Sequence, residues 1–185
     1  MRSPELELEK RAHKLRGETL RAVHYQRGTE SDDFDSVEHL VFLDFKSGNR
    51  VAIGCTDELR YKHGWGISVK PQRVIDTAYG LPKDVTKSPR WSSRVGRTIA
   101  HARIHWDDIK ERLRSSLAIG VAIHADHLSR LDYPQTLELD FGEDNSILIA
   151  AARRSGSGSG ATPFVNQLVV FFSAESRAAA LPSKV

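Results

Sequence analysis

The eight histidines are the first side chains that could do chemistry, because imidazole binds metals and exchanges protons near neutral pH. His101 and His105 stand four residues apart, which places both on one face if this segment is helical. A second pair, His124 and His127, has an aspartate between its members. Zinc sites need about four converging ligands, and the His-Glu-x-x-His signature is absent. We therefore expect no metal site, and a histidine-dependent hydrolase or metalloenzyme is the least favoured function.

Asp44 and Asp140 form a second candidate pair, because each stands in the tripeptide Leu-Asp-Phe. Two facing carboxylates could act as an acid and base or bind a divalent cation. Strand periodicity argues against this, since Leu43 and Phe45 occupy one phase and Asp44 the other. We expect both aspartates to be solvated acids.

Other signatures of catalysis and cofactor binding are missing from the sequence. There is no Gly-x-Ser-x-Gly elbow and no Gly-x-Gly-x-x-Gly motif after a strand. The Gly/Ser run at 155–160 lacks the lysine and the following helix of a phosphate-binding loop. The single Cys55 ends an apolar strand pattern and is expected to be a small buried residue. We predict no catalytic residues and no cofactor, and we favour a binding protein over an enzyme.

Charge is distributed unevenly, although the net charge is only +3. Residues 83–114 carry nine Lys or Arg against four acids, whereas residues 30–44 carry six acids and no Lys or Arg. Basic residues with interleaved aromatics are typical of surfaces that bind phosphates and stacked bases. The basic segment can also pair with the acidic one, within the molecule or between subunits, and we favour this charge matching. The candidates for nucleic-acid contact are Arg90, Trp91, Arg94, Arg97 and Arg103.

Hydrophobic periodicity predicts the elements that would position these side chains. A helix is expected from Pro4 to Leu15, because proline suits the first helical turn, acids follow it and Gly17 can end it. A second helix is expected from Asp107, as its cap, to Arg114. The segment 71–98 contains several Pro and Gly and should hold little regular structure. Strands are predicted over residues 19–26, 37–45, 50–55, 65–69, 117–125, 137–141, 146–152 and 164–172.

Two stretches of the chain resemble each other. The pattern Leu-Asp-Phe, then Asn, then Val/Ile-x-Ile runs over residues 43–53 and again over 139–149. Upstream, Ala22-Val23-His24 resembles Ala122-Ile123-His124 if two residues are inserted. Two ordinary hairpins could coincide in this way, but we favour a duplicated unit. The fold expected is α+β, with two pseudo-repeated halves that each combine a helix with an antiparallel sheet of about four strands. We assign residues 1–70 to the first repeat, 71–98 to a basic connection, 99–173 to the second repeat and 174–185 to a tail.

The repeated hairpin, with a Gly-rich return strand such as Gly64-Trp65-Gly66-Ile67, resembles small bacterial immunity and antitoxin-type domains. The resemblance covers the two hairpins and implies a non-catalytic protein whose charged surface occludes a partner protein. No binding residue can be carried over from it. From charge alone, we expect a basic partner, such as a nuclease toxin, to be steered toward the acidic segment. The candidate partner-binding residues are Asp32, Asp33 and Asp35. A nucleic-acid-binding regulator is the alternative function.

Composition sets the broad class of the protein. The chain is 39% hydrophobic and 28% charged, as in soluble globular proteins. No apolar run approaches the ~20 residues that cross a bilayer, and the N-terminus lacks the apolar core of a signal peptide. We expect a cytoplasmic location with no membrane partner, and we leave a homo-oligomer open. The lone cysteine agrees with a reducing compartment.

Overall fold

The structure is a computed structural model that describes residues 4–31, 34–56, 66–72, 79–108, 132–143, 145–154 and 161–173. Across these residues the chain is mostly antiparallel β-sheet with few helices. The helices are α1 (Pro4–His13) and α2 (Pro89–Ser92). The strands are β1 (Leu20–Thr29), β2 (Asp35–Phe45), β3 (Arg50–Thr56), β4 (Gly66–Pro71), β5 (Lys83–Asp84), β6 (His101–Asp108), β7 (Asp132–Asp140), β8 (Ser146–Arg154) and β9 (Ala161–Phe171).

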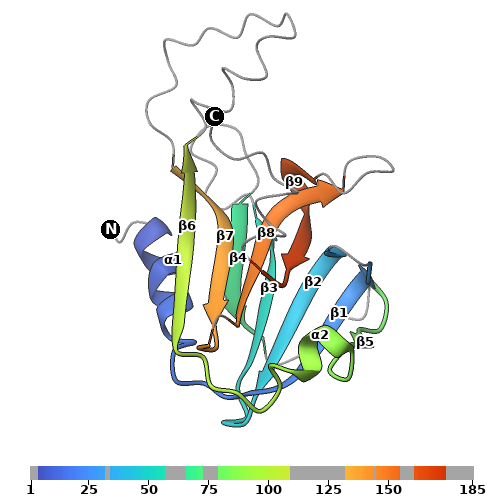
Figure 1. The fold of residues 1–185 in the computed structure, drawn as a ribbon. Coiled ribbons are helices and arrows are strands. Elements are labelled where there is room, and N and C mark those ends of the chain that lie inside the picture. Colours follow the sequence, from blue (N-terminus) through green and yellow to red (C-terminus); the bar gives the residue numbers. More distant parts are fainter. Residues whose placement is uncertain are drawn as a thin grey trace, which may run out of the picture.

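The strands form one curled sheet in the order β4-β3-β2-β9-β8-β7-β6, with β1 beside β2 and β5 beside β1 (Figure 1). Strand β2 changes neighbours along its length, because residues 35–37 pair with β9 and residues 40–44 pair with β3. The curl brings β4 into contact with β7 and β8. Helix α1 contacts both β4 and β6, which end this strand order, and so bridges the two edges. Among the described residues there are two hydrophobic clusters, and the larger one draws residues from α1, from β1 to β4 and from β7 to β9.

Helix α1 is held in place by an apolar stripe. Leu8, Ala12 and Leu15 are buried, and their spacing places them on one helical face. Acidic residues in the first turn and basic residues in the last turn complement the helix dipole. The following turn reaches Gly17, whose φ of +85° suits glycine. The predicted helix and its stop are confirmed, although the regular helix ends at His13.

The two hairpins that look alike in sequence also share their strand register. In the β2–β3 hairpin Leu43 pairs with Val51, and in the β7–β8 hairpin Leu139 pairs with Ile147. The turns match as well, because Phe45 N–H donates to Asn49 O (2.9 Å) and Phe141 N–H donates to Asn145 O (3.1 Å). The predicted hairpin strands are therefore confirmed in both places.

The upstream part of the sequence match is not reproduced. Residues 22–24 lie in β1, beside β2, whereas the corresponding place beside β7 is taken by β6. Residues 122–124 and the predicted strand over 117–125 lie outside the described residues. The division into domains at 70, 98 and 173 stays a prediction.

The helix predicted to begin at Asp107 is wrong at its start, because Asp107 and Asp108 belong to β6 and pair with β7. Alternation explains this outcome: Ala102, Ile104 and Trp106 pack against the core at every second position, which is strand periodicity. The rest of that predicted helix, 109–114, lies outside the described residues.

The connection between the two hairpin regions was predicted to hold little regular structure, and its residues 79–98 agree with this. Its described part contains the two-residue strand β5 and the four-residue helix α2. Within the described ranges, no helix is long and apolar enough to cross a bilayer.

Candidate functional site

Three of the candidate residues meet in a buried polar network. Trp91 Nε1–H donates to the Tyr25 hydroxyl (2.6 Å), which donates to Asp35 Oδ2 (2.8 Å), and Arg90 Nη1–H donates to Asp35 Oδ1 (3.2 Å). Trp91 is 0% exposed and Asp35 is 1% exposed. The network fixes helix α2 against β1 and β2. The expected surface roles of Asp35 and Trp91 are therefore wrong, because neither side chain can reach a partner.

Burial governs the acidity of this network. Desolvation raises the pKa of Asp35, and the Tyr25 hydrogen bond and the Arg90 charge offset only part of that rise. Desolvation and the neighbouring carboxylate raise the pKa of Tyr25 well above its ordinary value. Tyr25 therefore keeps its proton at neutral pH and acts as a hydrogen-bond donor.

The basic connection lies against the acidic segment of the same chain. Lys83 Nζ is 2.8 Å from Glu30 Oε1, and Arg90 pairs with Asp35. The prediction of intramolecular charge matching is confirmed by these two pairs. Asp32 and Asp33 lie outside the described residues, so their role as partner-binding residues stays a prediction.

The remaining nucleic-acid candidates do not form one surface. Arg94 is 8% exposed, and its guanidinium donates to the carbonyl oxygen of Phe172 (3.0 Å). Arg97 is exposed but pairs with Glu143 at 2.9 Å. Arg103 lies exposed in β6. Because Trp91 and Arg94 are buried, the basic segment does not present all five candidates to a nucleic acid.

The histidine pair lies on a strand instead of a helix. His101 is exposed, and His105 Nε2 lies 2.8 Å from Glu138 Oε2 on the neighbouring strand β7. Among the described residues, no three His, Cys, Asp or Glu side chains are grouped so that they could hold a metal ion. The arrangement is a single cross-strand pair.

Asp44 is buried, so the expectation of a solvated acid is wrong. Its cross-strand neighbour Arg50 covers it, with Nη2–H donating to Oδ2 (2.7 Å) and Nε–H donating to Oδ1. Arg21 and His24 also approach the carboxylate. Burial acts to raise the pKa of Asp44, but the Arg50 hydrogen bonds and charge outweigh it and hold the pKa below its ordinary value. Asp140, by contrast, is half-buried and accepts a hydrogen bond from Gly142 N–H (2.7 Å).

Cys55 is shielded rather than reactive. It is half-buried against the core, and burial raises the pKa of its thiol to about 12. The thiolate is the nucleophilic form, so this side chain is inert at neutral pH. The predicted packing role agrees with this environment.

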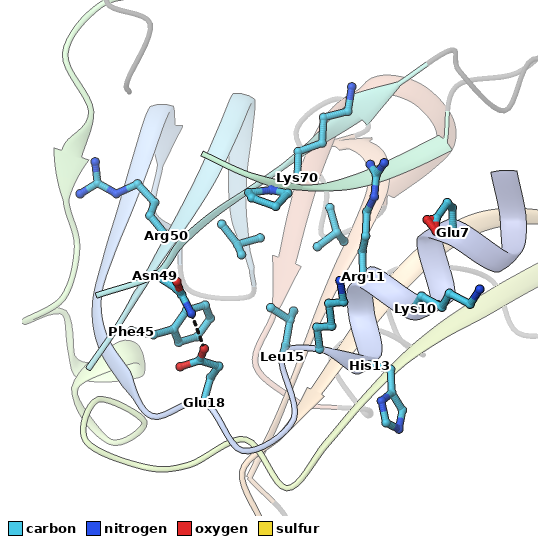
Figure 2. A pocket seen from close by; sticks show the side chains of 14 residues that line it. Glu7, Lys10, Arg11, His13, Leu15, Glu18, Phe45, Asn49, Arg50 and Lys70 are labelled. Carbon is cyan, nitrogen blue, oxygen red and sulfur yellow. Dashed lines mark hydrogen bonds between the residues drawn. The ribbon is translucent and has the colours of Figure 1, made fainter. Parts of the chain in front are cut away.

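Among the described residues, a cationic groove of ≈ 930 Å³ lies between α1 and the ends of β3 and β4 (Figure 2). Its apolar floor is continuous with the core and is formed by Leu15, Phe45, Val51 and Val69. Five Lys or Arg and two Glu line it. The charged lining residues are Glu7, Lys10, Arg11, Lys14, Glu18, Arg50 and Lys70.

Helical periodicity explains how α1 presents this charge. Leu8, Ala12 and Leu15 turn toward the core, so Arg11 and Lys14, three residues apart, fall together on the flank beside the groove. Lys14 continues the helical turn, because its N–H donates to Lys10 O (3.1 Å). In Figure 2 the Arg11 side chain extends from α1 toward the strand that carries Lys70, whereas Arg50 points away from the helix.

Three groove cations, on α1 and the turn that follows it, lack an acidic partner among the described residues. Across the described ranges, Lys10, Arg11 and Lys14 make no ion pair, whereas Lys83 and Arg97 do. Their positive charge is therefore available to an anionic group that enters the groove. Sequence reasoning missed this site because it treated the charged positions of α1 only as helix signals.

Glu18 closes one end of the groove. Its carboxylate accepts hydrogen bonds from Ser47 Oγ (2.6 Å) and Asn49 Nδ2 (2.8 Å), so the β2–β3 turn holds it in place.

The sequence did contain one signal of the groove, which is the spacing of Lys10, Arg11 and Lys14 around the apolar stripe. That spacing indicates a cationic flank but not the element that faces it.

No known family model matches the chain, and neither does any curated protein or solved structure. The resemblance to immunity and antitoxin-type domains therefore stays a prediction from the sequence.

Proposed function

We propose that this chain is a non-catalytic protein-binding module that captures an acidic partner protein in the cationic groove. The observation that carries the proposal is the set of α1 cations without acidic partners among the described residues, facing a concavity with a packed floor. A partner carboxylate placed there gains charge-assisted hydrogen bonds and electrostatic steering. The expected charge of the partner is thus opposite to the one inferred from the acidic segment, because Lys and Arg predominate in the groove lining.

The packed floor supports binding by a preformed surface. Leu15, Phe45 and Val69 are each at most 3% exposed and belong to the main core. A groove built on such residues needs little reordering when a partner enters, and ordering costs oppose binding. The charged residues at the rim select for an acidic partner, and the apolar floor gives the groove a fixed shape.

A labelled hepta-glutamate peptide tests the proposal by fluorescence anisotropy at low salt. The wild-type chain should bind it, and Arg11→Glu with Lys14→Glu should weaken binding at least about fivefold, since exposed charge pairs each contribute up to about 1 kcal/mol. The control combines Arg27→Glu and Arg103→Glu, two exposed cations outside the groove with the same change in charge. Arg11→Gln with Lys14→Gln provides a milder variant if the reversal unfolds α1. An equal loss of peptide binding in the groove reversal and in the control reversal would mean that the peptide responds only to net charge.

Nucleic-acid binding is the second candidate, and the same unpaired cations favour it, because phosphates are also drawn to clustered Lys and Arg. A single-stranded oligonucleotide of equal charge is titrated in parallel. Tighter binding of the oligonucleotide than of the peptide, with loss in the Arg11 and Lys14 variants, would select this function instead.

We also propose that the β1–β4 and β6–β9 regions derive from one duplicated unit. The shared register of the β2–β3 and β7–β8 hairpins supports this, as does the similar run of consecutively paired strands on each side. We place the protein in the cytoplasm on the evidence of its lone cysteine.

A further inference from the structure

We infer that the groove recognises a short acidic motif, two carboxylates at alternate positions of an extended segment, and discriminates against continuous polyanions. This inference rests on the proposed function, because it names the part of the partner that enters the same groove. The order of positive and negative charges along the groove, and not only their net sign, determines which anion fits.

Acids bracket the cationic stretch of the groove. Glu7 lies one helical turn before Arg11, and Glu18 lies beyond Lys14 at the other end of the lining. Glu18 is held by two hydrogen bonds from the β2–β3 turn, so it does not swing away when an anion approaches. Like charges placed together oppose binding, so the groove accepts an anionic stretch only as long as its cationic part.

The length of the cationic part matches two alternate side chains. Arg11 and Lys14 are separated by about 4.5 Å along the helix axis, from a rise of 1.5 Å per residue. Side chains at positions i and i+2 of an extended peptide lie on the same face, about 6.6 Å apart. The long side chains of Arg11 and Lys14 can span the difference. Adjacent acids would point to opposite faces, and only one of them could reach the groove.

This charge pattern favours a peptide over a nucleic-acid strand. A phosphate backbone carries one charge at every nucleotide, so its charges continue past the cations toward Glu7 or Glu18. A protein segment can place two acids at the cations and neutral residues at both ends. The occupant we infer is therefore an extended segment of the acidic partner protein.

Three labelled heptapeptides separate this inference from the proposed function: Gly-Ser-Glu-Ser-Glu-Ser-Gly with alternate acids, Gly-Ser-Glu-Glu-Ser-Ser-Gly with adjacent acids, and hepta-glutamate. The alternate peptide should bind about two- to fivefold more tightly than the adjacent one, the range expected for one additional exposed charge pair. Both carry the same net charge, so any difference reports spacing.

Glu18→Gln tests the bracketing acid. The glutamine oxygen can still accept from Asn49 Nδ2–H, and its amide N–H can donate to the Ser47 hydroxyl, while the charge is removed. It should strengthen hepta-glutamate binding about two- to fivefold and change binding of the alternate peptide less than about 1.5-fold. Glu38→Gln, at an exposed acid outside the groove, is the matched control and should not distinguish the peptides.

The outcomes are distinguishable. Equal affinities for the alternate and adjacent peptides, or equal gains for both tested peptides in Glu18→Gln, overturn the inferred motif while the proposed function stands. Absence of binding by all three peptides overturns both. Preference for a single-stranded oligonucleotide over hepta-glutamate overturns the choice of a peptide.

Discussion

The Tyr25 hydroxyl donates a hydrogen bond to the Asp35 carboxylate across 2.8 Å inside the fold. The two residues come from neighbouring strands, β1 and β2, and the indole of Trp91 in α2 donates to the same hydroxyl. An acid that the sequence places on a charged surface loop is thereby part of the internal framework. Among the described residues, the cations that line the groove on the flank of α1 have no acidic partner.

Tyr25→Phe should destabilise the fold by about 1–3 kcal/mol, because it removes one hydrogen bond to Asp35 and leaves the Trp91 N–H without its acceptor. Urea denaturation followed by circular dichroism measures the free energy of unfolding. Tyr79→Phe removes a hydroxyl from a tyrosine that is 46% exposed, and it should change stability by less than about 0.5 kcal/mol. Equal effects of the two substitutions would contradict the network.

Leu8→Ala should cost about 2–5 kcal/mol, because Leu8 is 6% exposed and anchors α1 between the sheet edges. Leu6 lies on the same helix but is 46% exposed, so Leu6→Ala should cost less than about 0.5 kcal/mol. The same denaturation measurement compares these two leucines. A small cost at Leu8 would mean that α1 is not packed as described.

Asp44 should give an acid-dependent contribution to stability. Its pKa in the folded chain is lowered by Arg50 against the opposing effect of burial, so the folded state binds its proton less readily than the unfolded state. The stabilisation is present above the ordinary Asp pKa of about 4 and is lost as pH falls through the lowered folded value.

The measurement for Asp44 is the free energy of unfolding of wild type and Asp44→Asn from neutral pH down to about pH 2. The advantage of wild type should be largest near neutral pH and should shrink below about pH 4. Glu38→Gln at an exposed acid serves as the control. An advantage that grows as pH falls would show that the sign is wrong.

Local patterns were enough to predict the hairpins and the first helix. Apolar alternation and the Gly or Asn of the turns determine both hairpins, and their common register follows from the repeated spacing. The same reasoning failed at β6, where an aspartate that resembles a helix cap lies inside a strand, because Trp106 and its alternate neighbours pack against the core.

The candidate site could not be predicted from the alternation of residues along the strands, because it depends on contacts between different elements. Phase assigned Asp44 to the outer face of β2, but the partner that buries it, Arg50, is specified only by pairing across strands. The groove likewise requires α1 to lie against β3 and β4, which is a tertiary contact between distant segments. The cations were visible in the sequence, whereas the surface facing them was not.

The most direct test of the account is the ratio of dissociation constants for hepta-glutamate between Arg11→Gln with Lys14→Gln and the wild-type chain at low salt. We predict that the double variant binds at least about threefold more weakly and that this ratio falls toward one as salt screens the charges. The pair Arg27→Gln with Arg103→Gln should stay close to wild type. A ratio of one for the groove variant at low salt, or an equal loss in the control, would contradict capture through the groove.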